Sequence, residues 1–255
     1  MKPSRPSLLI IGHGSSESNE AEEAVREHVV TLKQSQRYGF VGAQFLKGRS
    51  VPPELPEGEV FLLPFFMSQG YFVSQTIPRL FDLNDGEKTE GHRRILLCDA
   101  VGVDPALSEI LDVMAMEICR DRQYHVKDVT ILLVAHGSAK STASSEATRL
   151  QAEMLLNRSD FNTVSVAFLE EAPTLTDWLA KERNPLNPVI IIGLFAAEGP
   201  HAVEDVPNEI QDGQKRFRQA YNREPGEVHY AGVVGTRPEI VRLIQQSVSR
   251  RAGSA

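Results

Sequence analysis

The sequence predicts an α/β protein built from two homologous halves, each a parallel sheet layered between helices. Short apolar runs alternate with segments of helical periodicity throughout the 255 residues, an order typical of parallel sheets. In addition, an apolar run followed by His-Gly-Ser occurs at His13 and again, 123 residues later, at His136. We therefore expect homologous halves at residues 1–125 and 126–255, facing one another across a cleft.

The repeat continues beyond the His-Gly-Ser motif. Residues 63–78 align without gaps on residues 192–207, at an offset of 129. Residues 101–105 and 234–238 share the pattern Val-Gly-x-x-Pro, at an offset of 133. An offset that grows slowly along the chain indicates a duplicated domain with short insertions.

Four apolar runs are nearly continuous, as expected of central strands that helices cover on both faces. They are residues 8–11, 60–66, 131–135 and 189–195. Shorter runs that end at Phe45 and Phe168, again 123 residues apart, predict one more strand in each half. Residues 85–92, rich in charge and containing Gly and Asp, are typical of a loop.

Six segments have the apolar spacing of helices. They are residues 18–36, 74–83, 105–120, 144–158, 203–221 and 238–250. In open α/β sheets, ligands bind beyond the carboxyl ends of the strands. Because both His-Gly-Ser motifs directly follow a predicted strand, we expect a binding site at that edge of the sheet.

The composition argues against several classes of protein. There are 27 Lys and Arg residues against 34 Asp and Glu residues, a net charge of −7, so nucleic acid and a membrane surface are not expected as partners. The longest apolar stretch, residues 189–197, is about half as long as a membrane span, and the N-terminus lacks the apolar core of a signal peptide. The two cysteines, Cys98 and Cys119, form no Cys-x-x-Cys pair. We expect a protein of the reducing cytoplasm.

Three strand ends in the second half supply His136, Glu170 and His201. Two neutral imidazoles and a carboxylate make an open site for a borderline divalent metal ion, and the same groups can accept protons from a substrate. The equivalent residues of the first half are His13, Lys47 and Phe72, a set that cannot bind a metal as well. We therefore expect the chemistry in the second half and a degenerate site in the first.

Two other motifs suggest different chemistry. Gly12-His13-Gly14 lacks the third glycine of a dinucleotide motif, and Gly-Lys-Ser/Thr does not occur, so no nucleotide is expected. Ser15 or Ser138 beside a histidine could serve a hydrolase, but neither lies in Gly-x-Ser-x-Gly, and a serine here is expected to cap the following helix.

Further polar residues have a structural interpretation. The acids around His201 either attract a cation or favour the start of a helix through its dipole. They are Glu198, Glu204 and Asp205.

The other histidines have no equivalent in the other copy of the repeat and are expected at the solvated surface. They are His28, His92, His125 and His229.

Together these residues resemble the class II tetrapyrrole chelatases, of the CbiX/SirB type, in their long form with two fused homologous halves. The resemblance covers nearly the whole chain. It is carried by the two His-Gly-Ser turns, the Val-Ala-Phe-Leu-Glu run that ends at Glu170, and the Gly-x-His-x-x-x-Asp-Val-Pro segment that ends at Pro207.

The resemblance implies a lyase that inserts cobalt(II) or iron(II) into sirohydrochlorin without ATP, toward cobalamin or siroheme. His136, His201 and Glu170 would bind the metal and carry the catalysis. The metal, whether cobalt, iron or nickel, is a substrate, and the tetrapyrrole is the partner molecule. A chain with both halves fused has no need of a second copy, so we expect a monomer. Basic candidates for the carboxylates of the macrocycle are Arg149, Lys47 and Arg79.

One departure leaves alternatives open. In the family, long forms often carry the histidine pair in the N-terminal half, whereas here Phe72 and Lys47 replace the second histidine and the glutamate. The chain is then either an enzyme whose second half is active, or a protein that binds or delivers tetrapyrrole or metal without insertion. A hydrolase built around His-Gly-Ser is a third alternative.

Overall fold

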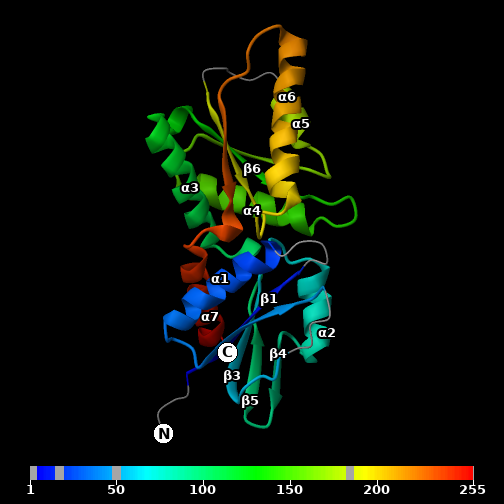
Figure 1. Ribbon diagram of the computed structural model, residues 1–255, viewed down its shortest axis with the longest axis vertical. Helices are drawn as coiled ribbons and strands as arrows, with labels where there is room; N and C mark the ends of the chain where they lie inside the picture. Colours follow the sequence, from blue (N-terminus) through cyan, green and yellow to red (C-terminus); the bar gives the residue numbers. More distant parts are fainter. Residues whose placement is uncertain (1–4, 15–19, 48–52, 182–186, 255) are drawn as a thin grey trace. The chain divides into compact units, whose positions relative to one another are not determined.

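The computed structural model describes residues 5–14, 20–47, 53–181 and 187–254, which form two compact units (Figure 1). Unit 1 comprises Met1–Asp104 and Pro238–Ala255, and unit 2 comprises Pro105–Arg237. Each unit has its own sheet and its own apolar core.

The sheet of unit 1 has five strands in the order β2-β1-β3-β5-β4. The strands are β1 (Ser7–Gly12), β2 (Phe40–Phe45), β3 (Gly58–Pro64), β4 (Glu87–Glu90) and β5 (Arg93–Leu97). All neighbours pair in parallel except β4, which is antiparallel to β5. The prediction that the runs at residues 8–11 and 60–66 are central strands is confirmed, because β1 and β3 lie inside the sheet.

The sheet of unit 2 has four parallel strands in the order β7-β6-β8-β9. The strands are β6 (Thr130–Ala135), β7 (Thr163–Phe168), β8 (Val189–Gly193) and β9 (Val228–Val233). This order repeats that of β2-β1-β3-β5, so the duplication seen in the sequence is also a duplication of topology. The central strands β6 and β8 coincide with the predicted runs.

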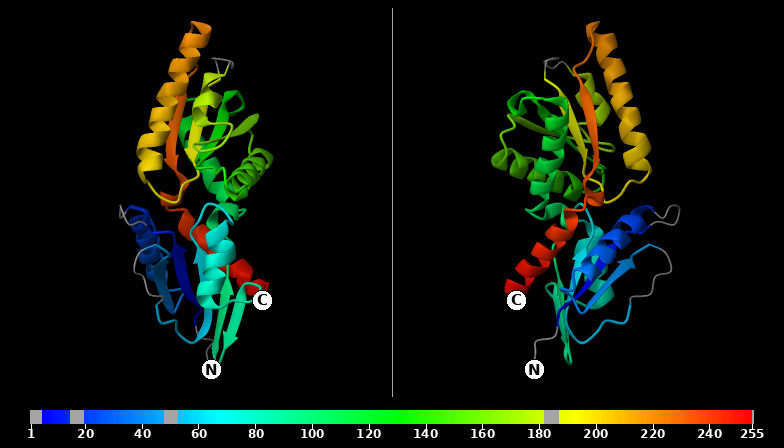
Figure 2. Two further views of the ribbon diagram at one scale, coloured as in Figure 1. Left: turned by 90° about the vertical axis from the view of Figure 1, so that its right-hand side faces the viewer. Right: turned by 60° about the vertical axis from the view of Figure 1, so that its left-hand side comes forward.

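Helices cover both faces of each sheet. In unit 2 they are α3 (Leu107–Arg122), α4 (Ala143–Arg158), α5 (Leu175–Ala180) and α6 (Val206–Tyr221). Leu179 and Val206 pack with Leu132 and Val134 of β6 in one apolar cluster, which places α5 and α6 on one face. Helices α3 and α4 lie on the other face (Figure 2).

In unit 1 the helices are α1 (Glu20–Gln34), α2 (Ile77–Phe81) and α7 (Ile240–Gly253). Ile77 and Phe81 of α2 pack on Leu9 and Ile11 of β1. Helix α7, the red C-terminal helix of Figure 1, contacts α1 and β3.

The last helix of each sequence half belongs to the unit formed mainly by the other half. Helix α3 follows the strands of unit 1 along the chain but packs on α4, β8 and β9 of unit 2, while α7 follows the strands of unit 2 but packs in unit 1. The compact units therefore differ from the sequence halves 1–125 and 126–255 by an exchange of these two helices. The expected cleft between the halves stays a prediction.

The Val-Gly-x-x-Pro repeats mark the points where the chain leaves each sheet for the exchanged helix. Each forms a turn of 3₁₀ helix, Val101–Val103 and Val234–Thr236. A Cβ atom on Gly102 would lie 2.0 Å from the carbonyl oxygen of Met67, and one on Gly235 would lie 2.2 Å from that of Ala196. Only glycine allows this close backbone approach, which explains why both repeats have it.

The prediction of a loop at residues 85–92 is wrong, because Glu87–Glu90 form β4. This strand is short, charged and at the sheet edge, where partly exposed residues lack the apolar pattern of an inner strand.

Helix α5 was not predicted from the sequence. Its N-cap, Thr174, accepts a hydrogen bond from the backbone N of Asp177 at 3.1 Å. Of the helix predicted at residues 18–36, Ser18 and Asn19 lie outside the described residues.

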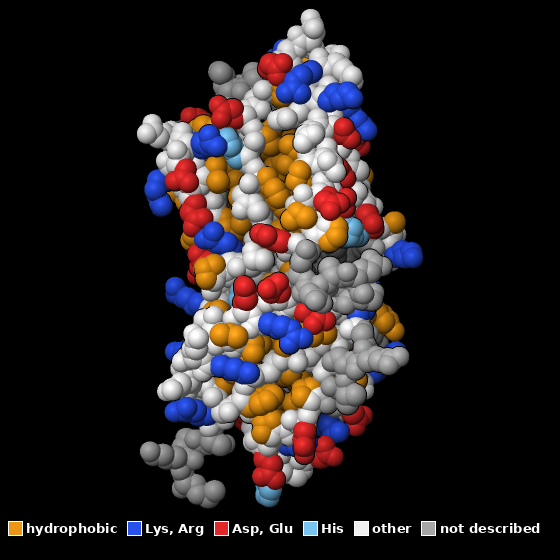
Figure 3. All heavy atoms as spheres, in the orientation of Figure 1, with side chains coloured by type: hydrophobic (Ala, Val, Ile, Leu, Met, Phe, Trp, Pro, Cys, Tyr) orange, Lys and Arg blue, Asp and Glu red, His pale blue; other side chains and the backbone are white. Residues whose placement is uncertain are grey.

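Within the described part of the chain, no helix is both long and apolar enough to cross a membrane. On the face drawn in Figure 3, Lys and Arg side chains are interspersed with Asp and Glu side chains.

Candidate functional site

The His-Gly-Ser turn of unit 2 brings Glu170 beside His136. His136 follows β6, and Gly137 has a φ of +74°, a left-handed conformation that favours glycine. The backbone N of Leu169 donates to the oxygen of Ala135 at 3.1 Å, and that of Glu170 donates to the oxygen of His136 at 2.9 Å. These bonds extend the pairing of β6 and β7 past the strand ends.

The third predicted residue, His201, opens a π-helical turn, His201–Asp205, that leads directly into α6. The oxygen of Gly199 anchors this turn, because it accepts from the backbone N of Ala202 at 2.8 Å and of Val203 at 3.1 Å. The turn follows β8, so His201 reaches the same sheet edge as His136.

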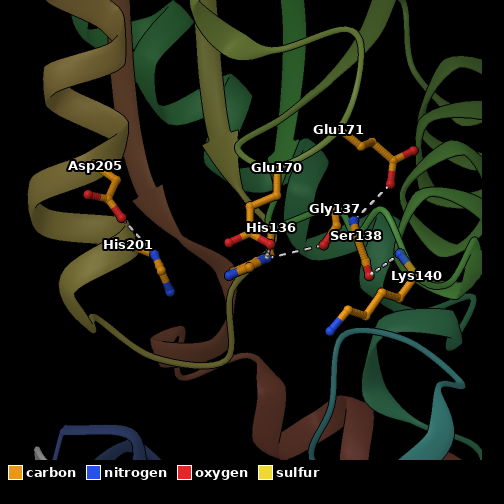
Figure 4. A network of polar contacts seen from close by, with 8 residues as sticks. All are labelled: His136, Gly137, Ser138, Lys140, Glu170, Glu171, His201 and Asp205. Carbon is orange, nitrogen blue, oxygen red and sulfur yellow. Dashed lines mark hydrogen bonds and ion pairs between the residues drawn. The ribbon is translucent and has the colours of Figure 1, made fainter.

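The two histidines meet edge to face. Their ring centroids are 4.5 Å apart, with an interplanar angle of 89°. The Nδ1 atom of His136 lies 3.5 Å from Oε2 of Glu170. Figure 4 shows the ring of His136 directed toward that of His201, with Glu170 above His136. The three residues that the sequence singled out thus lie together in unit 2.

Hydrogen bonds fix which nitrogen of each ring is open. Nδ1 of His136 lies 3.1 Å from the carbonyl oxygen of Gly137, and Nδ1 of His201 lies 2.6 Å from Oδ2 of Asp205. A carbonyl oxygen and an ionised carboxylate can only accept, so Nδ1 is the donor in each neutral ring. The lone pair is then on Nε2 of both rings, where it can bind a metal ion or a proton.

Glu170 does not complete a set of three ligands in this arrangement. Among the described residues, no group of three or more His, Cys, Asp or Glu side chains is placed to hold a metal ion. The physical reason is that Glu170 approaches His136 from the Nδ1 side, whereas the open lone pairs are on Nε2. The side chain of Glu170 is 61% exposed, so it has room to turn. The metal-ligand set His136, His201 and Glu170 stays a prediction.

Asp205 is the partner of His201. From the sequence, Asp205 is expected either to attract a cation or to favour the start of the helix. In the structure its carboxylate orients the imidazole of His201, as carboxylates commonly do behind histidine ligands of metals.

Glu171 was missed by the sequence analysis. Its Oε2 accepts from the backbone N of Ser138 at 2.9 Å and holds the His-Gly-Ser turn in place. The first repeat has Gly48 at this position, so the comparison of the repeats gave no signal for it.

The expectation that Ser138 caps the following helix is wrong. Helix α4 begins only at Ala143, and Ser138 instead accepts from the backbone N of Lys140 at 3.1 Å within the turn. Residues 136–142 separate the end of β6 from the start of α4, and the sequence pattern did not reveal this separation. Ser15, the equivalent serine in the first half, lies outside the described residues.

Unit 1 repeats the turn without the partners. Gly14 has a φ of +73°, the backbone N of Lys47 donates to the oxygen of His13 at 2.7 Å, and Nδ1 of His13 lies 3.0 Å from the oxygen of Gly14. In place of a second imidazole, the ring of Phe72 lies 4.8 Å from that of His13, at 77°. Burial, and next the positive charge of Lys47, lower the pKa of His13 below 6.5.

The other histidines divide into two groups. His92 and His125 are exposed, as predicted. The prediction is wrong for His28, which is buried beside Phe65, and for His229, whose Nε2 lies 2.7 Å from the hydroxyl of Tyr124. Each contacts an aromatic residue distant in the sequence, Phe65 for His28 and Tyr124 for His229, and such contacts cannot be seen in the local sequence pattern.

Of the three basic candidates, Arg149 belongs to unit 2, whereas Arg79 and Lys47 belong to unit 1. Arg149 lies over the ring of Phe168, 5.5 Å from its centroid, beside a hollow of about 440 Å³. Arg79 donates to Gln75 at 3.2 Å, and Lys47 is exposed beside His13. Their contact with a macrocycle stays a prediction.

Comparisons with known proteins agree with the repeat. Residues 7–117 and 130–251 each match the family model described as CbiX. A curated relative in Halobacterium salinarum, named "Probable sirohydrochlorin cobaltochelatase", is 26% identical over 272 residues, which cover 97% of this chain and 91% of the relative.

Two solved structures share the fold. DR2241 from Deinococcus radiodurans, described as a multi-domain protein with structural similarity to chelatases, superposes with a TM-score of 0.77 at 21% identity; the match covers 96% of this chain, which spans 55% of the length of DR2241. SirB from Bacillus subtilis, solved with Fe3+, superposes with a TM-score of 0.71 at 15% identity and covers 97% of this chain and 96% of SirB. The predicted two-half α/β fold is confirmed.

Proposed function

Because the chain belongs to the CbiX family, we propose that it inserts a divalent metal ion, cobalt or iron, into sirohydrochlorin without a nucleotide. The name of the curated relative supports cobalt and sirohydrochlorin, and the Fe3+ of the SirB structure supports iron. The observation that carries the proposal is the edge-to-face pair His136 and His201, which presents two open Nε2 atoms, with Glu170 on the Nδ1 side of His136.

The chemistry of insertion needs groups of this kind. A metal ion that enters the macrocycle loses its water ligands and displaces two pyrrole N–H protons. A neutral imidazole can hold the ion through Nε2 and can accept a proton at the same atom near pH 7. Since the ion must leave with the product, two imidazoles and a carboxylate that is free to turn suit the task better than a closed cage of four ligands.

The second half is proposed as the active one. In unit 1 the ring beside His13 is that of Phe72, which has no lone pair to bind a metal. The cation Lys47 stands where unit 2 has a carboxylate. A positive charge beside the site repels a metal ion. Unit 2 instead places Glu170 and Asp205 on its histidines.

We propose that the supply of each metal ion in the cell decides whether cobalt, iron or nickel is inserted. Imidazole and carboxylate ligands follow the general affinity order of divalent metals and do not select one of them. We also propose that the protein acts as a monomer in the cytoplasm. Both of its cysteines are free and buried, in keeping with a reducing compartment.

The test is the anaerobic absorbance of sirohydrochlorin mixed with cobalt(II) at neutral pH, with and without the purified protein and without ATP. The proposal predicts that the spectrum of the metallated macrocycle appears faster with protein. Insertion at the spontaneous rate would contradict it.

A second candidate function is binding or delivery of tetrapyrrole or metal without insertion. The position of Glu170 on the Nδ1 side of His136 favours it, because the ligand set is then incomplete. In the same experiment, a delivery protein shifts the spectrum of the macrocycle or of cobalt(II) on binding but leaves the insertion rate at its spontaneous value.

A further inference from the structure

The two exchanged helices are each held by an ion pair at an equivalent place. Asp104 ends the turn before α3 and pairs with Arg250 of α7. Arg237 ends the turn before α7 and pairs with Glu117 of α3, through two hydrogen bonds of 2.7 and 3.0 Å. Asp104 and Arg237 are 133 residues apart, and so are Glu117 and Arg250. The two pairs are therefore copies of one contact in the duplicated fold.

The charges of the two copies are reversed. The first half carries both acids, Asp104 and Glu117, and the second half carries both bases, Arg237 and Arg250. Each pair thus joins one residue of the first half to one of the second. If two first halves exchanged helices with one another, Asp104 would meet Glu117; if two second halves did so, Arg237 would meet Arg250. Like charges at such short range repel strongly once they are partly buried.

Burial makes this contact sensitive to charge. The side chain of Asp104 is only 2% exposed, so a carboxylate there requires a cation. The Arg237 side chain is 24% exposed, and its two-pronged contact with Glu117 demands a planar acid opposite it. Exposed surface ion pairs contribute little to stability. When one partner of a partly buried pair is replaced by a like charge, however, the folded protein loses much of its stability.

We propose that these four charges make the exchange of α3 and α7 specific for unlike halves. The surface around each junction accepts the last helix of the complementary half and rejects that of an identical half, whether in the same chain or in a second copy. Specificity of this kind needs a repulsive contact in the wrong pairing as well as an attractive one in the right pairing, and the reversed charges supply both.

The test uses two variants of the full chain that have the same composition and net charge. Glu117→Arg with Arg250→Glu exchanges charges between the two pairs, so both contacts within the chain become like-charged while contacts between identical halves become complementary. Glu117→Arg with Arg237→Glu exchanges charges within one pair and keeps both contacts complementary. Neither changes the buried Asp104. The readouts are the thermal midpoint and the molecular mass by light scattering.

The proposal predicts that the first variant melts lower than the parent protein, by on the order of 10 °C, and contains dimers that the parent lacks at the same concentration. The second variant keeps the midpoint and mass of the parent. The proposal is overturned if the first variant retains both parental values, or if the second loses as much as the first.

A third measurement keeps the test decisive if the first variant does not fold. Arg237→Glu alone places a second carboxylate against Glu117 at a contact that is partly exposed, so the protein is expected to fold with a lower midpoint. Adding Glu117→Arg should restore the midpoint. Failure of this rescue would show that charge complementarity does not govern the contact.

Discussion

The Nδ1 atom of His201 lies 2.6 Å from Oδ2 of Asp205, four residues further along the same π-helical turn (Figure 4). The short contact holds Nδ1 of His201 and so leaves its Nε2 lone pair open, while the ring lies edge to face with that of His136. Asp205 is thus a positioning residue for the imidazole.

Replacement of Asp205 by Asn should slow metal insertion about 10–100-fold, the usual cost of losing such a partner behind a histidine. An amide presents either an oxygen or an NH₂ group to Nδ1 and carries no charge, so the orientation is held less firmly. The measurement is the insertion rate as a function of pH. Glu204→Gln removes a neighbouring exposed carboxylate and serves as the control, with the parental rate expected. Equal rates for Asp205→Asn and the parent would show that the contact has no role in positioning.

His136→Ala should lower the insertion rate by about 10²–10⁴-fold, because it removes both a metal ligand and a proton acceptor. His13→Ala should have a smaller effect, since His13 faces Phe72 rather than a second imidazole. Both side chains are partly exposed, so circular dichroism should show that both variants remain folded. A loss from His13→Ala as large as that from His136→Ala would overturn the assignment of the chemistry to the second half.

The site of unit 1, which we propose is degenerate, should be repairable. Lys47→Glu with Phe72→His restores the residue types of unit 2 at equivalent positions, where the backbone turns already match in their hydrogen bonds. We expect the double variant to bind one more cobalt(II) ion per chain than the parent, measured by absorbance titration without the macrocycle. Phe72→Leu is the matched control and should bind no additional ion. An unchanged stoichiometry in the double variant would mean that the two turns differ in more than these side chains.

His13 should make stability depend on pH. Burial first, and Lys47 second, hold the pKa of His13 in the folded protein below 6.5. Between that lowered pKa and 6.5, the unfolded chain binds more protons than the folded one, so the free energy of unfolding rises with pH. The contribution is fully present above 6.5 and is lost as the pH falls through the folded pKa.

Lys47→Met removes the second cause and should raise the pKa of His13 toward 6.5, which weakens this dependence; His13→Gln should abolish it. Urea unfolding at pH values about one unit either side of 6.5 measures the difference between parent and variant. A steeper dependence in Lys47→Met would contradict the attribution to Lys47.

The sequence predicted the fold well where periodicity and duplication reinforce one another. The central strands β1, β3, β6 and β8 are buried on both faces and read as continuous apolar runs. Strand β4 escaped prediction because its residues are charged and lie at an edge. The exchange of α3 and α7 also escaped it, because a helix has the same periodicity whichever sheet it packs against.

The sequence indicated which residues lie together in the candidate site, but not how their rings are oriented, and their role as metal ligands stays a prediction. His136, Glu170 and His201 were expected to lie close together because each follows the end of a predicted strand. In the structure, His136 lies beside both His201 and Glu170 in unit 2. Which nitrogen each ring leaves open depends on hydrogen bonds to Gly137 and Asp205, which residue types alone do not specify.

The most direct test of the central claim is the anaerobic rate of cobalt insertion into sirohydrochlorin by His201→Phe. This substitution copies into unit 2 the His-Phe pair that unit 1 has naturally at His13 and Phe72, so the fold has a precedent for it. If the histidine pair of the second half carries the reaction, the variant should bind the macrocycle and insert cobalt no faster than the spontaneous rate. If it inserts cobalt at the parental rate, the pair His136 and His201 is not the site of insertion.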